Sequence, residues 1–383
     1  MTINKSGKIV IAGDLFPIKG NVSYFINGDI DILFGEKIIQ LFSDADVAIC
    51  NLEGALTGNP DKSKKTGPVK LAPTNAIEAY KRLGIDYCML ANNHVTDGGH
   101  RGVLDTIETL EMSGIKYIGA GKNENEIVRS FVKTVGGMNI GFYNVGETMY
   151  NRPTRNAAGA WLYDEYIVCR EIEQLKEKCD YLIVIYHGGI EKFRFPSPEV
   201  RKRLHRMADC GANLILSQHT HCIGCEEYYN GSYLLYGQGD FLLNNFAPGL
   251  TDSGLIMELV VENGKVEIKR HLVKSVDSLL VRYNEQQDLT DFYERSKIVI
   301  DEEFVFRQFQ SFCDNELKLY LTAFKSPSKI RLRFRHYFPT AYKKWLFRYS
   351  ERDLMFALHT LRSEQNRETA MVGIERYLQL FQK

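Results

Sequence analysis

The sequence predicts an α/β fold in which helices are layered on a mixed β-sheet. From Lys8 to about Leu272, short apolar segments alternate with segments of helical character. Glycines follow the helical segments at Gly84, Gly114 and Gly211, where the end of a helix favours a residue that tolerates positive φ. A strand-like segment comes directly after each of these glycines, which indicates βαβ connections and parallel strand pairs.

The individual elements follow from local patterns along the chain. Strands are predicted where short apolar runs occur, at Lys8–Ala12, Val47–Cys50, Tyr87–Ala91, Tyr181–Tyr186 and Asn213–Ser217. Helices are predicted in the longer segments between the strands, at Thr74–Leu83, Gly102–Ser113, Tyr166–Lys178 and Pro198–Cys210. Further along, Asn230-Gly231 and Asn263-Gly264 indicate hairpin turns, so we expect antiparallel strands beside the parallel ones.

A chain of 383 residues exceeds one ordinary domain, and its character changes from about Ser275. We therefore expect an α/β domain at residues 7–273 and a mostly helical C-terminal extension at residues 274–383. Within the extension, apolar residues recur at helical spacing over 304–324 and 371–381, which predicts two amphipathic helices.

A basic segment at residues 325–348 lies inside the predicted extension. It carries eight Lys and Arg residues and no acidic residue, with aromatic residues interleaved. Runs of like charge are usually solvated faces, which is the favoured interpretation. The alternative is a patch for phosphate-rich partners, either anionic lipid head groups at a membrane surface or a polyanionic polymer.

Bulk composition excludes several classes of protein. Acidic and basic residues balance at 48 each, so no nucleic-acid partner is expected. The first residues lack the apolar core of a signal peptide, and no stretch is long and apolar enough to span a bilayer. The eight cysteines are scattered and form no disulfide framework. A cytoplasmic protein, with peripheral contact to the inner face of the membrane as the further option, is therefore expected.

Polar side chains follow the ends of the predicted strands. Outside the strand ends of an open α/β sheet, loops converge on one crevice, so these side chains are expected to lie close together. They offer carboxylate, amide and imidazole groups and include no lysine or arginine, as a divalent metal site requires. The candidate metal ligands are Asp14, Glu53, Asn93, His187, His219 and His221.

Each of these residues alone is more often a cap, a turn or a satisfied polar group, and their joint occurrence carries the prediction. Glu53 is a carboxylate that could bridge two cations. Two cations about 3.5–4 Å apart polarise a phosphoryl group and lower the pKa of a water between them. His94, oriented by Asp97, is predicted to act as a general acid or to stabilise charge. Without thiolate ligands, manganese, iron, zinc and magnesium all remain open.

The chain resembles the CapA family of capsule-synthesis proteins, which is associated with poly-γ-glutamate production, within the calcineurin-like metallophosphoesterase superfamily. The similar motifs extend over roughly residues 7–272 and include Gly13-Asp14, Asn51–Gly54, Ala91–Gly98, His187–Glu191, His219-Thr-His221 and Tyr236–Phe241. The resemblance implies a four-layer sandwich of two mixed β-sheets flanked by helices. It also implies a dinuclear site with Asp14 and His221 on one metal, Asn93, His187 and His219 on the other, and Glu53 between them.

The sequence departs from the superfamily pattern at three places. The first motif is usually Asp-x-His, whereas here it reads Asp14-Leu15-Phe16, so one expected imidazole is missing. The first metal is therefore expected to be bound more weakly, or to be completed by water or another side chain. Ser217-Gln218 stands where a glycine is usual, and Asp240 stands where an asparagine is usual.

The predicted function is a metallophosphoesterase-like hydrolase linked to capsule or exopolymer biosynthesis. Its expected partner is a phosphorylated small molecule or a polyanionic polymer, and the expected cofactor is a pair of divalent metal ions. One alternative is an enzyme that acts on a γ-glutamyl amide polymer with the same site. Another is a non-catalytic assembly factor of an envelope-polymer machine, for which Phe16 in place of a histidine is the motivating feature.

Overall fold

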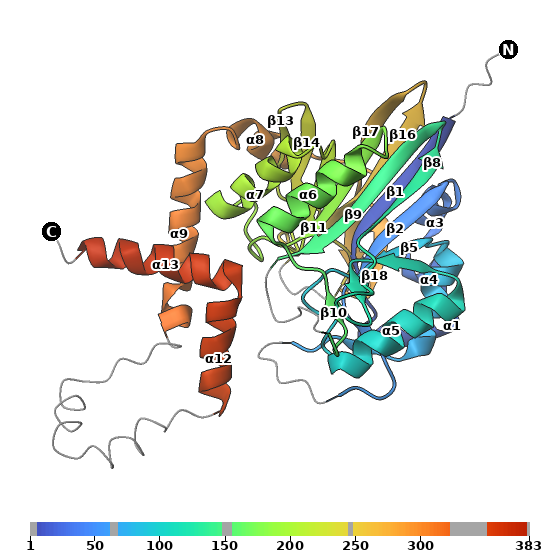
Figure 1. The fold of residues 1–383 in the computed structure, drawn as a ribbon, viewed down its shortest axis with the longest axis horizontal. Coiled ribbons are helices and arrows are strands. Elements are labelled where there is room, and N and C mark those ends of the chain that lie inside the picture. Colours follow the sequence, from blue (N-terminus) through green and yellow to red (C-terminus); the bar gives the residue numbers. More distant parts are fainter. Residues whose placement is uncertain (1–5, 62–67, 148–154, 244–247, 322–350, 381–383) are drawn as a thin grey trace. The chain divides into compact units, whose positions relative to one another are not determined.

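The computed structural model describes residues 6–61, 68–147, 155–243, 248–321 and 351–380 (Figure 1). The chain divides into two compact units: the first contains most residues up to Phe306, and the main part of the second begins at Arg307. The predicted domain boundary at residue 273 stays a prediction. The basic segment 325–348 lies outside the described residues.

The larger sheet of the first unit has eight strands among the described residues and is mixed, as predicted. Its parallel part consists of β1 (Ser6–Leu15), β2 (Val47–Leu52), β5 (Tyr87–Met89) and β6 (Lys116–Ile118). Antiparallel strands extend it on the other side of β1, namely β16 (Ser253–Glu262), β17 (Lys265–Val276) and β18 (Leu280–Tyr283). The short strand β15 (Asp240–Leu242) pairs in parallel with the end of β1.

The smaller sheet of the first unit has a parallel centre and antiparallel edges. Its strands follow the order β13 (Glu226–Tyr229), β14 (Ser232–Tyr236), β12 (Leu214–Gln218), β11 (Tyr181–His187), β9 (Met138–Gly146) and β8 (Ser130–Val135). The predicted hairpin turns are confirmed: Asn230-Gly231 joins β13 to β14 and Asn263-Gly264 joins β16 to β17, all four residues having positive φ. Two minor ladders pair β3 (Ala55–Leu56) with β4 (Leu71–Ala72) and β7 (Ala120–Gly121) with β10 (Gly159–Ala160).

Helices cover the outer face of each sheet (Figure 1). The larger sheet packs against α1 (Val22–Asn27), α2 (Ile30–Leu33), α3 (Glu36–Ser43), the 3₁₀ turn at Thr74–Ala76, α4 (Ile77–Leu83) and α5 (Gly99–Ser113). The smaller sheet packs against α6 (Glu165–Lys176) and α7 (Pro198–Asp209). The helix α8 (Thr290–Ile298) follows the last strand. The four predicted helices therefore form, within one to three residues of their expected ends.

Alternation along the strands places the core between the layers. On β1, Ile9 and Ile11 pack between the two sheets, whereas Val10 and Ala12 pack against the helices of the larger sheet. Since successive side chains of a strand point to opposite faces, a continuous apolar run is what a strand buried on both faces requires. The expected four-layer sandwich, with helices outside two facing sheets, is confirmed.

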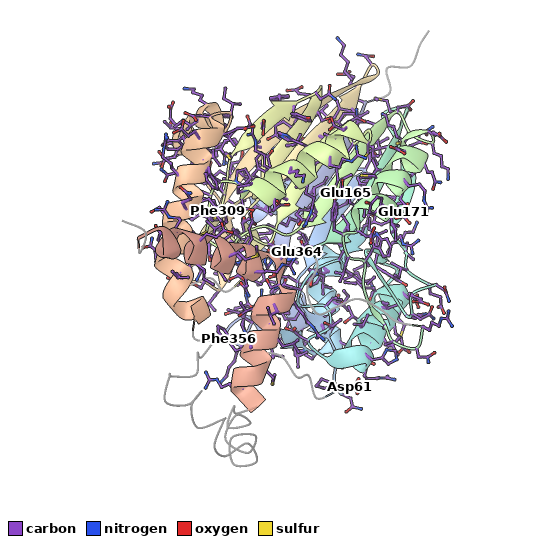
Figure 2. All side chains as sticks on the ribbon, turned by 60° about the vertical axis from the view of Figure 1, so that its left-hand side comes forward. Asp61, Glu165, Glu171, Phe309, Phe356 and Glu364 are labelled. Carbon is purple, nitrogen blue, oxygen red and sulfur yellow. The ribbon has the colours of Figure 1, made fainter. Side chains whose placement is uncertain are left out.

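The second unit is helical, as the sequence predicts. It contains most of α9 (Glu302–Leu321) together with α12 (Glu351–Arg362) and α13 (Glu364–Leu380). Phe309, which Figure 2 labels, and Cys313 are buried one helical turn apart on α9. Arg376 on α13 donates to Asp314 on α9 at 2.7 Å, so the two predicted amphipathic helices contact each other. None of the helices in the described part of the chain combines the length and apolar character needed to cross a membrane.

The backbone of Gly13 lies so close to β15 that a side chain there would clash. A Cβ added at Gly13 would lie 2.3 Å from the carbonyl oxygen of Gly239. We expect Gly13→Ala to lower the free energy of unfolding by about 1–3 kcal/mol, the usual cost of overpacking. Urea denaturation measures this change. Gly58→Ala is the matched control, because a Cβ there meets nothing within 4 Å. Equal midpoints for Gly13→Ala and the unmodified protein would contradict the expectation.

Candidate metal centre

The carboxyl ends of five strands and the loops after them bring the predicted residues together. Asp14 lies near the end of β1, Glu53 directly follows β2, and His187 ends β11. Asn93 and His94 follow β5, and His219 and His221 follow β12. All six predicted ligands, and also His94 and Asp97, are buried.

Glu53 lies among the imidazoles. Its Oε1 atom is 3.7 Å from Nε2 of His187 and 3.8 Å from Nε2 of His221. The Oδ1 atom of Asn93 lies 3.0 Å from Nε2 of His187. Glu53, His219 and His221 each offer a donor atom, and these three atoms lie within 4.8 Å of one another. The spacing is suitable for donors that share cations.

A second group of donors consists of Asp14, His221 and Asp240. The Oδ2 atom of Asp14 is 3.4 Å from Nδ1 of His221, and Oδ1 of Asp240 is 2.9 Å from the same nitrogen. These three side chains also offer donor atoms within 4.8 Å of one another. His221 therefore belongs to both groups, with one ring nitrogen towards Asp14 and the other towards Glu53.

The loop that carries His219 and His221 has an unusual backbone conformation. His219 has φ of 84° and His221 has φ of 56°, both in the left-handed region that residues other than glycine rarely adopt. Such conformations cost about 1–3 kcal/mol each and are concentrated at functional sites. Here they turn two imidazoles, separated by one residue, towards the same carboxylate.

Burial and neighbouring charge set the ionisation of the imidazoles. Burial lowers the pKa of His187 well below its usual value, and the positive charges of His219 and His221 lower it further, so this ring is neutral. Burial also opposes the charged form of His221, but the negative charges of Asp240 and Glu53 raise its pKa well above its usual value. His221 thus carries a proton at neutral pH when no metal replaces it.

Burial and neighbouring charge also set the pKa values of the carboxylates. Burial tends to raise the pKa of Asp14 and Glu53, yet the neighbouring imidazole of His221 and the charge of Lys70, respectively, bring both pKa values below the usual range. Both groups are therefore ionised. Burial raises the pKa of Asp240 to about 7, and His221 opposes that shift.

Hydrogen bonding leaves several buried oxygens unused. The Oδ2 atoms of Asp14 and Asp240 and the Oε1 atom of Glu53 accept no hydrogen bond from the described residues. Buried anionic oxygens without donors are costly unless a cation coordinates them. Oxygen donors of this kind beside a neutral imidazole fit a divalent metal ion.

Two asparagines form hydrogen bonds that fix the orientation of the predicted ligands. Asn51 donates through Nδ2 to Oδ1 of Asp14 at 2.7 Å and lies 3.2 Å from Nδ1 of His187. Asn92 in turn donates to the side-chain oxygen of Asn51 at 3.0 Å. Such outer contacts fix the orientation of metal ligands.

The predicted pair of His94 and Asp97 also forms. Nδ1 of His94 lies 2.6 Å from Oδ2 of Asp97, and the same oxygen accepts a hydrogen bond from the backbone nitrogen of Lys70 at 2.7 Å. The side chain of Lys70 forms an ion pair with Oε2 of Glu53. Asp97 thereby positions both the imidazole and the lysine.

Sequence reasoning missed Lys70, Asp240, Glu147 and Glu191 as members of this site. Glu147 lies 3.8 Å from Nε2 of His219 and directly follows β9, so its position after a strand was an available signal. Burial would raise the pKa of Glu191, but the neighbouring His221 and His219 lower it. Glu191 stands in the same motif as His187. Lys70 has no comparable signal in the sequence.

Comparison with known proteins finds a matching family and several relatives. Residues 8–245 match the family described as "Bacterial capsule synthesis protein PGA_cap". The capsule biosynthesis protein CapA of Bacillus anthracis is 26% identical over 199 residues, which cover 50% of this chain and 48% of that protein. The PGA biosynthesis protein CapA of Bacillus subtilis is 25% identical over 234 residues, covering 60% and 61% respectively. The matched region therefore spans about half to three fifths of these curated relatives.

Solved structures similar to this chain include a putative nucleotidase and a phosphatase. A putative 5'-nucleotidase from Staphylococcus aureus aligns with a TM-score of 0.46 and 15% identity, over 77% of this chain and 58% of that chain. A structure described as a novel phosphatase from Mycoplasma pneumoniae aligns with a TM-score of 0.44 and 17% identity, over 76% of this chain and all of that chain.

The family match extends over the whole candidate centre. Every predicted ligand, from Asp14 to His221, lies within residues 8–245, which make up more than half of the 383 residues of the chain. The resemblance expected from the motifs is confirmed. The chain belongs to the bacterial capsule synthesis protein family PGA_cap.

Proposed function

We propose that this chain is a metal-dependent hydrolase that cleaves a phosphoester. The observation that carries the proposal is the pair of buried, ionised carboxylates of Asp14 and Glu53, whose unused oxygens lie near imidazole nitrogens. A divalent cation coordinates anionic oxygens and imidazole nitrogens together.

Two groups of donors support two ions, of manganese, iron, zinc or magnesium. In this proposal Glu53 is shared by both ions, Asp14 and His221 hold one ion, and Asn93, His187 and His219 hold the other. When bound, such a pair of ions polarises a phosphoryl oxygen and supplies a water whose pKa is lowered to about 7. The protein contributes neutral His187, ionised Asp14 and Glu53, and the asparagine contacts that keep these ligands oriented.

His94 and Lys70 have roles towards the substrate in this proposal. Asp97 contacts Nδ1 of His94 and orients its ring, and we assign the protonated ring to donate a proton to the leaving oxygen. The side chain of Lys70 is 17% exposed and its ammonium group lies beside Glu53, so it can meet an anionic substrate at the centre.

The substrate class follows from the centre and from the relatives. Two-metal sites are used by phosphatases and nucleases, and the curated relatives are named for capsule and PGA biosynthesis. We therefore place the reaction in the biosynthesis of an envelope polymer, with a phosphorylated small molecule or a polyanionic polymer as the substrate.

A second candidate is hydrolysis of a γ-glutamyl amide bond. Relatives from Mycobacterium tuberculosis are named as probable polyglutamine synthesis accessory proteins, with 28% identity over 222 residues. The same two ions would polarise an amide carbonyl as well as a phosphoryl group. Product analysis with a γ-linked glutamyl oligomer and with a phosphodiester distinguishes the two candidates.

Turnover of aryl phosphomonoesters and phosphodiesters in Mn²⁺ tests the main proposal. We expect Glu53→Gln and His187→Ala to lower kcat/KM by about 10²-fold or more, because each removes a ligand of the ions that stabilise the transition state. Glu258→Gln is the matched control, since Glu258 is also a buried carboxylate paired with a histidine, His271, at 2.9 Å, but lies outside the centre. Turnover that survives both ligand substitutions would contradict the proposal.

The affinity for Mn²⁺ is expected to rise with pH between about pH 6 and pH 8. The ion must displace the proton that the raised pKa of His221 favours on this ring, and Asp240, whose pKa is about 7, also loses its proton when it becomes a ligand. Release of one proton gives about a tenfold gain in affinity per pH unit. Calorimetry in two buffers of different ionisation enthalpy counts the protons. An affinity that does not change with pH would refute this expectation.

His94→Ala is expected to lower kcat by about 10²-fold while leaving the binding of Mn²⁺ unchanged, because His94 is assigned to proton transfer. Steady-state kinetics and metal titration measure the two quantities separately. His205→Ala serves as control, since this histidine contacts Glu227 and Tyr229 outside the centre. A loss of bound metal in His94→Ala would instead make His94 a ligand.

A further inference from the structure

We propose that Asp240 is a direct ligand of the ion held by Asp14 and His221, and that it supplies the donor that Phe16 does not. This inference rests on the proposed metal-dependent function and deepens it. The centre would then have an additional carboxylate in place of an imidazole on that ion, which makes this ion site richer in negative charge.

Strand pairing brings the two aspartates together. Asp240 begins β15, which runs parallel to β1, and its Cα is the register partner of the Cα of Asp14. The register of β1 shifts beside Asp14 in its pairing with both β15 and β2. An irregularity of this kind re-aims a side chain at the end of a strand. The close approach of Gly13 and Gly239 keeps the two strands tightly apposed at this point.

The donor atoms of Asp240 point into the group. Its Oδ1 atom is 2.9 Å from Nδ1 of His221, and its Oδ2 atom is buried and accepts no hydrogen bond from the described residues. Oδ2 of Asp14 is likewise buried and accepts no hydrogen bond from the described residues, and it lies 3.4 Å from Nδ1 of His221. The relative exposures of Asp14, His221 and Asp240 are 1%, 6% and 6%, so solvent compensates little of their charge.

Charge balance favours a cation at this position. Two carboxylates that share one imidazole repel each other, and a single imidazolium neutralises only one of them. A divalent ion coordinated by both carboxylates, by the imidazole and by the shared Glu53 would have four protein ligands, and an ion that prefers six ligands would keep positions for water.

Phe16 cannot contribute to the coordination. Its ring is 2% exposed and packs against Gly54, where an added Cβ would lie 2.3 Å from a ring carbon. An apolar ring at this place offers no donor to a metal ion. A further protein donor, besides Asp14, His221 and the shared Glu53, must come from another strand, and β15 provides it through Asp240.

Cobalt titration of the purified full chain tests the assignment. Co²⁺ reports both stoichiometry, by elemental analysis after dialysis, and coordination, by its visible absorption spectrum. We expect two ions in the unmodified protein, one in Asp240→Ala, one in His187→Ala, and none in the double variant. Glu258→Ala, which removes the buried carboxylate beside His271, is the control and should keep two ions and the unmodified spectrum.

Two results would overturn the assignment while leaving the proposed function intact. One is an Asp240→Ala protein that holds two ions with the unmodified spectrum at unchanged affinity. The other is a protein with the same stoichiometry and spectrum but about 10–100-fold weaker binding, which makes Asp240 a positioning residue that only orients His221. An unmodified protein that binds no Co²⁺ would instead overturn the proposed function itself.

Asp240→Asn keeps the test decisive if the alanine variant does not fold. The amide conserves the volume and can still contact His221, so near-ultraviolet circular dichroism should match that of the unmodified protein. Replacing an anionic ligand by a neutral one should weaken one of the two ions by about tenfold or more and change the cobalt spectrum. An unchanged spectrum and affinity would contradict the role of Asp240 as a ligand.

Discussion

The burial of negative charge at the carboxyl ends of neighbouring strands is the constraint on which this site depends. Asp14 and Glu53 are fully enclosed and ionised, and their oxygens are only partly satisfied by hydrogen bonds. Such an arrangement is stable only with positive charge close by. The protonated ring of His221 and the ammonium group of Lys70 supply it in the protein alone.

The sandwich explains how groups so far apart in the chain share that charge. Parallel strands end at the same edge, and the two sheets face each other, so β1 and β2 of one sheet and β11 and β12 of the other deliver side chains to one place. Few of these side chains can move independently. Asn51 joins Asp14 to His187, and Asp97 joins His94 to Lys70, so the ligand groups and the proposed catalytic groups are coupled through single side chains.

Much of the fold could be predicted because its signals are local. Glycines with positive φ end α4 and α5, and Ser197 and Asp164 cap α7 and α6 through side-chain hydrogen bonds to the backbone. The candidate ligands could be predicted for a related reason, since each stands directly after an apolar strand.

The parts that could not be predicted depend on tertiary pairing. Asp240 reaches Asp14 only because β15 lies beside β1, and no local pattern encodes that register. Lys70 precedes a two-residue strand and reaches Glu53 through the pairing of β3 with β4 and the contact of its backbone with Asp97. The predicted set of site residues therefore lacked the positive charge of Lys70, which lies beside Glu53.

The ion pair between Lys70 and Glu53 has a consequence for how the protein matures. Because an internal ammonium group already offsets the enclosed glutamate, folding of the sandwich need not wait for an ion from solution. Under the proposed metal-dependent function, folding and metal loading would then be separable steps.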